Sequence, residues 1–174
     1  SCEALFEEIE KIEPIAKNIH ERLKISPACS LIQPYHILVD QLKEKSNSLN
    51  TIVTTLRGIG PAYEDKVGRR SIKFSDLLDL MSIKEKLFNI LDFHNKVLTK
   101  LLNAEELDPQ IIFTDLKKFQ YLAKSYSCNT NELVEDFYKN GDDIIFEGAQ
   151  GSMLDIDHGT YPFVTSVSYT HLTL

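Results

Sequence analysis

The fold is decided by two stretches, and the first, residues 51–70, reads TIVTTLRGIGPAYEDKVGRR. β-Branched residues dominate Thr51–Leu56, which predicts a strand entering the loop that follows. Two glycines and a proline then predict a rigid loop over 57–70 whose backbone amides face a ligand. The loop carries four cations suited to phosphate oxygens, namely Arg57, Lys66, Arg69 and Arg70. Phosphate binding and a solvated basic turn both remain open for this loop.

The second stretch, residues 141–151, reads GDDIIFEGAQG. Its short apolar run predicts a buried strand over Asp142–Glu147 that ends in a second glycine-rich loop. Ligands of open α/β sheets bind where strands end in this way. The carboxamide of Gln150 offers a donor and an acceptor to a heterocycle, although the same group also satisfies backbone atoms in a tight turn.

Helical periodicity fills the sequence between and before the two predicted strands. We expect two short helices or one kinked helix up to residue 24, followed by helices over 35–45, 83–102, 109–123 and 130–140. The expected N-caps are Ser75, Ser82, Asp108 and Thr130, with Gly141 closing the last helix. This order predicts an α/β fold, with a central, mostly parallel sheet and a large helical insert between two strands.

Composition narrows the class of protein. The chain has 174 residues, a formal net charge of −7 and a pI of about 5.2, which argues against a broad basic face for nucleic acid. Apolar stretches are too short for a membrane span, and no secretory leader is visible, so we expect a cytoplasmic protein without a membrane partner. The cysteines Cys2, Cys29 and Cys128 have no metal-ligand or disulfide spacing, which fits a reducing compartment.

Several histidines and acidic residues are of types that bind metal ions. Asp155, Asp157 and His158 supply ligand types within four residues, but such clustering is more typical of turn chemistry, so we expect loop residues and no metal site. His94 lies next to an apolar stripe and His36 opens a helix, which predicts structural or solvent-facing roles for both.

The two glycine-rich stretches together resemble one family. The string Gly58-Ile59-Gly60-Pro61-x-Tyr63-x-x-Lys66-x-x-Arg69, preceded by two threonines, matches a signature of adenylosuccinate synthetase. Residues 146–151 (FEGAQG) and 155–166 (DIDHGTYPFVTS) look like the family's next block, in the expected order. Upstream, 25–29 (ISPAC) and 34–36 (PYH) are similar to the family's connector. The resemblance covers residues 1–166.

That resemblance implies an enzyme that joins L-aspartate to inosine monophosphate (IMP) with GTP on the route to AMP. In the family, the GTP γ-phosphoryl group is transferred to the purine 6-oxygen and the aspartate amine then displaces phosphate, with Mg²⁺ bridging the reacting groups. By correspondence, Thr55 and Thr165 bind the IMP phosphate and Gln150 lies near the purine 6-position. Arg69 corresponds to the arginine that reaches the partner subunit's nucleotide in a homodimer.

The sequence also departs from the family pattern. The family's glycine-rich nucleotide loop, with its catalytic aspartate and Mg²⁺ ligand, and its catalytic histidine have no counterpart in these residues. The resemblance therefore implies an internal fragment of a P-loop-type synthetase fold, without catalytic residues of its own and without the main ligands of Mg²⁺ and GTP. Residues 167–174 diverge from the family and are expected to be a non-native tail. The alternative is a non-catalytic α/β module that binds a phosphorylated ligand.

We predict that the purified 174-residue chain does not form adenylosuccinate, because the phosphoryl-transfer groups of the family are absent from its sequence. The measurement is product formation from IMP, GTP and aspartate with Mg²⁺ present. GTP- and aspartate-dependent product above a no-enzyme control contradicts the prediction.

Overall fold

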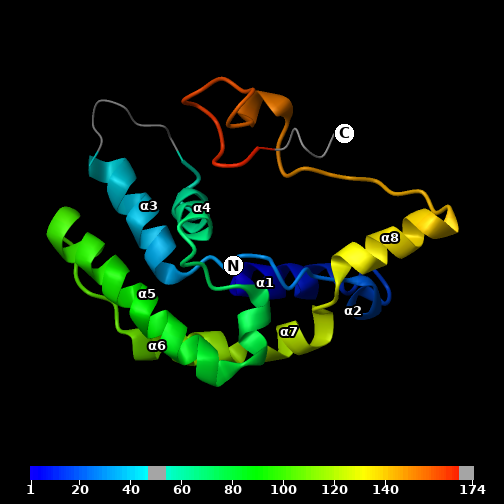
Figure 1. The fold of residues 1–174 in the computed structure, drawn as a ribbon, viewed down its shortest axis with the longest axis horizontal. Coiled ribbons are helices and arrows are strands. Elements are labelled where there is room, and N and C mark those ends of the chain that lie inside the picture. The colour runs from blue at the N-terminus through cyan, green and yellow to red at the C-terminus, as the bar shows by residue number, and fades with distance from the viewer. Residues whose placement is uncertain (47–53, 169–174) are drawn as a thin grey trace.

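The computed structural model describes residues 1–46 and 54–168, and the described chain is mainly helical (Figure 1). The helices follow a curved path, α8 extends outward from it, and the chain after α8 returns as a long loop. In chain order the elements are α1 (Cys2–Ile12), α2 (Ile19–Arg22), α3 (Pro34–Ser46), α4 (Ile59–Val67), the 3₁₀ helix η1 (Phe74–Leu78), α5 (Leu80–Leu101), α6 (Pro109–Lys118), α7 (Gln120–Tyr126), α8 (Thr130–Asn140) and the 3₁₀ helix η2 (Ser152–Leu154).

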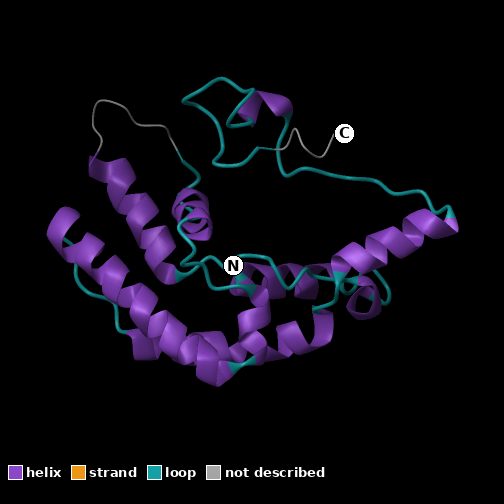
Figure 2. Ribbon diagram, in the orientation of Figure 1, coloured by secondary structure: helices purple, strands orange, loops and turns teal. Residues whose placement is uncertain are grey.

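The predicted central parallel sheet is not seen in the described residues (Figure 2). Within the ranges 1–46 and 54–168, extended pairing is limited to isolated bridges, Ile25 with Ser127 and Ser30 with Lys73. The predicted strand Asp142–Glu147 is wrong for this chain, since these residues form a loop. A strand needs a neighbour to satisfy its backbone groups, and the loop instead leaves Ile145 92% exposed.

The first predicted strand, Thr51–Leu56, falls partly outside the described residues, because 51–53 are not among them. Its described end is a turn, in which the Leu56 amide donates to the Thr54 hydroxyl and Leu56 has a φ of +56°. In the predicted tail 167–174, residues 169–174 also lie outside the described residues.

The predicted rigid loop over 57–70 is wrong in its centre, where residues 59–67 form α4. Pro61 is compatible with this helix because it stands in the first turn, where a backbone N–H has no intrahelical partner. Gly58, at a φ of +76°, precedes the first helical residue as its N-cap.

Most of the other helices confirm the sequence periodicity. The Asp108 carboxylate accepts the Gln110 amide as the N-cap of α6, and Gly141 closes α8 in the left-handed conformation. The predicted caps Ser82 and Thr130 are wrong, since Asp79 and Asn129 cap α5 and α8. Among the described helices, none combines the length and apolar character needed to cross a membrane.

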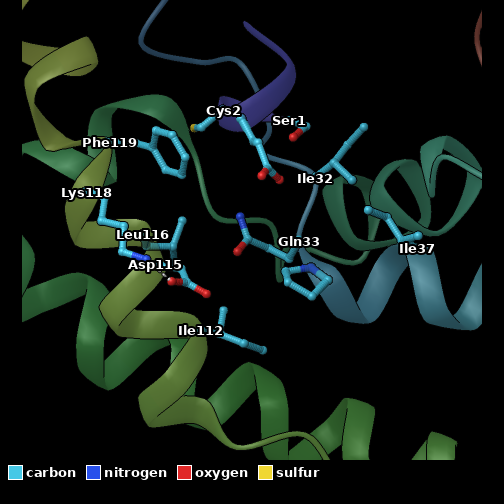
Figure 3. Close-up of a pocket in the computed structure, with 12 residues that line it drawn as sticks. Ser1, Cys2, Ile32, Gln33, Ile37, Ile112, Asp115, Leu116, Lys118 and Phe119 are labelled. Atoms are coloured by element: carbon cyan, nitrogen blue, oxygen red, sulfur yellow. Dashed lines mark hydrogen bonds and ion pairs between the residues drawn. The ribbon is translucent and has the colours of Figure 1, made fainter. Parts of the chain in front are cut away.

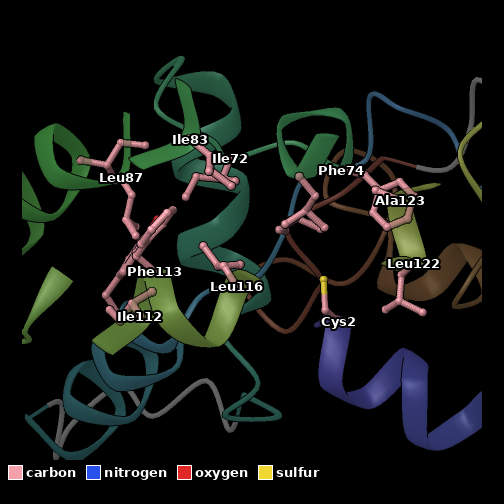
Figure 4. Packing of buried hydrophobic residues seen from close by; sticks show 14 of the residues in the cluster. Cys2, Ile72, Phe74, Ile83, Leu87, Ile112, Phe113, Leu116, Leu122 and Ala123 are labelled. Carbon is pink, nitrogen blue, oxygen red and sulfur yellow. The ribbon is translucent and has the colours of Figure 1, made fainter. Parts of the chain in front are cut away.

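A hydrophobic core joins α5, α6, α7 and η1 (Figure 4). Leu87 and Leu91 of α5 are fully buried, as is Leu77 of η1. Each fully buried aliphatic side chain stabilises the fold by about 1.5–3 kcal/mol. The predicted helix over 109–123 is two helices instead, because the chain turns at Phe119 between α6 and α7. The turn lets both helices face this core.

Helices α3 and α4 pack closely where α4 begins. A Cβ atom on Gly58 would lie 2.8 Å from the backbone carbonyl carbon of His36 and 2.8 Å from the amide nitrogen of Ile37. Such distances are incompatible with any side chain, so a glycine is needed both for the positive φ and for the contact. This contact fixes the start of α4 against α3.

We predict that Gly58→Ala destabilises the fold more than Gly141→Ala. Both glycines have similar positive φ values, +76° and +78°, so each alanine costs about 1–2 kcal/mol in backbone strain. Only Gly58 has backbone atoms within reach of a new Cβ, which adds about 1–3 kcal/mol. Urea unfolding of both variants measures the difference, and equal losses contradict the close packing of α3 on α4.

Candidate functional site

A buried carboxylate, Asp65 of α4, is the centre of a polar cluster. Its Oδ2 accepts hydrogen bonds from His36 Nε2 of α3 at 3.0 Å and from His94 Nε2 of α5 at 2.7 Å. Its Oδ1 faces Arg70, with Nε and Nη2 both 3.1 Å away. Both oxygens of the buried carboxylate therefore have donors, and four segments of the chain are joined at one side chain.

The three residues His36, Asp65 and His94 have the composition of a metal site. The tautomer of His36 argues against this role, because Nδ1 accepts the Gln33 backbone N–H at 3.0 Å. A neutral imidazole that accepts at Nδ1 carries its proton on Nε2, which then donates to the carboxylate and has no lone pair for a metal. The cluster is thus a hydrogen-bonded centre, and its two imidazoles also do not suit Mg²⁺, which prefers oxygen ligands.

Burial and hydrogen bonding shift the protonation of this cluster. Burial lowers the pKa of His36, and the hydrogen bond and charge of Asp65 offset only part of that effect. Burial by itself raises the pKa of Asp65, but the hydrogen bonds from both histidines outweigh it and hold the pKa well below its usual range. Burial and the Asp65 charge raise the pKa of Tyr35, which stacks on His94. The favoured state has an ionised Asp65 and a neutral His36.

A second buried carboxylate, Asp40 of α3, shapes the chain before α4. Its Oδ1 accepts the Thr54 hydroxyl at 3.1 Å and its Oδ2 accepts the Gly58 amide at 2.9 Å. Thr55 lies between these two anchored residues and is exposed. Asp40 therefore leaves Thr55 accessible on a turn held at both ends.

The loop that follows the second glycine-rich stretch is organised by Asp155, which is completely buried. Its Oδ1 accepts the backbone amides of Asp157 and His158 at 2.8 and 3.1 Å. The expectation of turn chemistry is confirmed for Asp155, whose carboxylate is bonded by its own loop. Thr165 is half-buried in the same region, and its hydroxyl is paired with backbone atoms of Val167.

The structure brings the chain that follows the second stretch to one end of α4. A Cβ atom on Gly60 would lie 3.2 Å from the Ser166 hydroxyl, so the segment containing Thr165 reaches the N-terminus of this helix. Thr55 precedes the same end. Arg69 lies beyond the opposite end of α4, exposed and at a φ of +61°. Gln150 lies on the exposed loop after α8.

A separate pocket of about 280 Å³ lies where α1 and α6 meet the start of α3 (Figure 3). Gln33 and Leu116 are among its lining residues, and the four sequence-predicted site residues are not. The pocket is therefore distinct from the candidate site at the N-terminus of α4.

Sequence reasoning missed Asp40 and Asp65, because each stands on a helix beside other charged residues and resembles part of a solvated face. His36 and His94 were expected to be structural or solvent-facing, and their burial confirms the structural alternative. Asp40, Asp65, His36 and His94 come from three different helices, so only the tertiary structure brings them together.

Comparison with known proteins identifies the family of this chain. The family model described as adenylosuccinate synthetase matches residues 1–173. The chain belongs to the adenylosuccinate synthetase family. The adenylosuccinate synthetase of Chromohalobacter salexigens is 47% identical over 170 residues, which cover 98% of this chain and 39% of the relative. That of Xylella fastidiosa strain 9a5c is 48% identical over 167 residues, covering 96% of this chain and 39% of the relative.

A solved structure described as fully ligated adenylosuccinate synthetase from Plasmodium falciparum has a similar fold, with a TM-score of 0.84 and 27% identity. The match covers 96% of this chain and 38% of that chain. The chain thus spans about two fifths of the length of these adenylosuccinate synthetases.

We predict that the free energy of unfolding decreases as the pH falls from about 7.5 to about 5. Unfolded histidine has a pKa of about 6.5, and His36 in the folded chain has a lower pKa. The unfolded state therefore binds a proton in this range that the folded state does not, which favours unfolding. Asp65, with its lowered pKa, adds a loss of stability only below about pH 4, the usual range of an unfolded aspartate.

Urea unfolding at several pH values measures this dependence. His36→Gln keeps a donor toward Asp65 but does not titrate, so we expect a smaller decrease in stability over the same pH range. His20→Gln removes a histidine outside the cluster and serves as the control. An unchanged pH dependence in His36→Gln contradicts the assignment.

Proposed function

We propose that this chain supplies the IMP-phosphate site of an adenylosuccinate synthetase, at the N-terminus of α4. The observation that carries the proposal is the approach of Ser166 to Gly60, which brings the Thr165 segment to the same helix end as Thr55. Two threonine hydroxyls in these positions suit the oxygens of a phosphomonoester. Thr55 is exposed, and the Thr165 hydroxyl would exchange its donation to the Val167 carbonyl for one to the ligand.

The helix end itself favours an anion. The first amides of α4 have no intrahelical partner, and the helix dipole places partial positive charge there. Phosphate binds at helix N-termini for these reasons. Asp40 orients the preceding turn by accepting the Gly58 amide and the Thr54 hydroxyl, which leaves the following hydroxyl of Thr55 for the ligand.

Arg69 supports a two-subunit arrangement. It follows the C-terminal end of α4, whereas Thr55 precedes the N-terminal end, and α4 has nine residues. A helix of this length spans about 13 Å, which exceeds the length of an arginine side chain. Arg69 therefore serves the nucleotide of a partner subunit in a homodimer, and the phosphate site of one subunit is completed by the other.

The proposed reaction of the complete enzyme is the GTP-dependent joining of L-aspartate to IMP. GTP with Mg²⁺ supplies the phosphoryl group that activates the purine 6-oxygen. The Asp65 cluster does not suit Mg²⁺, since it presents N–H donors toward the carboxylate. In this chain, Gln150 orients the purine through its carboxamide, and the two threonines and Arg69 bind the phosphate.

We also propose that the complete enzyme has the parallel sheet of the family fold and is located in the cytoplasm. The loop Asp142–Glu147 exposes Ile145 and Phe146, at 92% and 63% exposure. Apolar side chains in an extended run of this kind suit a strand that is buried in a larger parallel sheet.

We predict that Arg69→Ala in an adenylosuccinate synthetase of full family length raises KM for IMP about 10–100-fold, because hydrogen bonds to a charged partner contribute about 1.5–3 kcal/mol. KM for GTP is expected to stay within about twofold. Steady-state kinetics with each substrate varied measures both constants. Arg22→Ala, at an exposed arginine of α2, is the control and should change neither.

Mixing subunits tests whether Arg69 acts across the interface. A dimer of one Arg69→Ala subunit and one Thr55→Ala subunit retains one intact site only if Arg69 serves its partner. An equal mixture should then recover about a quarter of the wild-type activity by random pairing of subunits. Absence of recovery, with dimer exchange confirmed, contradicts the cross-subunit role.

A further inference from the structure

We propose that Asp65 is a positioning residue for IMP binding, which holds α4 so that Thr55 at one end and Arg69 at the other are correctly placed. This inference rests on the proposed function. Asp65 acts through the helix that carries it, and not by contact with the nucleotide.

Three segments outside α4 deliver their donors to this one carboxylate. His36 comes from α3, His94 from α5 and Arg70 from the turn after α4. His94 uses Nε2 as donor, and its Nδ1 is buried without a partner in the described part of the chain. The carboxylate thus determines how the side chains of three segments are oriented around α4.

Asp65 also controls the turn that carries Arg69. The backbone N–H of Arg70 donates to the carbonyl oxygen of Asp65 at 2.8 Å, and the Arg70 guanidinium is bonded to the carboxylate of the same residue. Arg69, immediately before Arg70, has a left-handed backbone that is unfavourable for a side chain of this size. Two bonds to one residue restrain that turn and set the direction in which Arg69 leaves it.

The other end of α4 is linked to the same cluster through His36. The backbone of His36 packs against Gly58, and the imidazole of His36 is bonded to Asp65. Asp65 follows Gly58 by seven residues. Seven residues are close to two helical turns, so both contacts lie on one side of α4. His36 therefore holds the helix at two points, and the turn containing Thr55 is fixed relative to both.

Stability alone gives a weak reason for such a cluster. Buried ion pairs carry a desolvation penalty, and apolar side chains of similar volume often stabilise a fold equally well or better. What the directional bonds add is one orientation of α4 and of the Arg69 turn. An effect on IMP binding in particular separates this role from general stabilisation.

The test is Asp65→Asn in an adenylosuccinate synthetase of full family length. The amide keeps the shape of the side chain but replaces an oxygen with NH₂, so either the histidines or Arg70 lose their acceptor. We expect KM for IMP to rise at least about tenfold, while KM for GTP and aspartate change less than about twofold. Glu64→Gln is the matched control, because this neighbouring carboxylate is exposed and bonded to Lys43 at the surface.

Two results overturn the proposal, namely a KM for IMP within about twofold of wild type and an equal rise for all three substrates. Wild-type enzyme that shows no IMP-dependent turnover contradicts the proposed function itself. The two failures are therefore distinguishable in one set of measurements.

A second pair of variants decides the matter if Asp65→Asn does not fold. His94→Gln keeps an N–H donor toward Asp65, whereas His94→Leu removes the donor and keeps a side chain of similar bulk. We expect near-normal KM for IMP in His94→Gln and a raised KM in His94→Leu. Equal values in the two variants overturn the positioning role.

Discussion

The ionised carboxylate of Asp65, buried at the junction of α3, α4 and α5, is the constraint on which the local architecture depends. A buried charge is costly unless hydrogen bonds replace its hydration, and here the donors come from His36, His94 and Arg70. Because these donors lie far apart in the sequence, the three helices must meet in one arrangement for all of the bonds to form. Of these helices, α5 is also held by the apolar core that it shares with α6 and α7.

Helices could be predicted well from the sequence because their signals are local. Asp108 and Gly141 mark helix ends through their own backbone preferences and short side-chain bonds. The strand Asp142–Glu147 could not be established in the same way, since strand formation depends on a neighbour that no local pattern reveals. The helix α4 was hidden by Gly60 and Pro61, which suggest a loop but are tolerated in a first turn.

The candidate site was partly accessible from the sequence. The two glycine-rich stretches indicated loops that could approach a ligand, and the approach of Ser166 to Gly60 brings the chain after the second stretch to the first. Thr55 was identified only by resemblance, because an exposed threonine has no distinctive local pattern. Arg69 stood out as one of four cations suited to phosphate, and the resemblance added only its role across the subunit interface. Asp40 and Asp65 could not be predicted from the sequence. Only their burial distinguishes them from other charged residues, and burial is a property of the tertiary structure.

The apolar run 144–146, in which Ile145 and Phe146 are exposed, affects the behaviour of this chain in solution. An extended apolar segment with unpaired backbone groups can serve as a template for β-pairing between molecules. Asp142, Asp143 and Glu147 flank the run with negative charge, and such charges act as gatekeepers against self-association. Their repulsion is screened by salt, so a higher ionic strength weakens this protection.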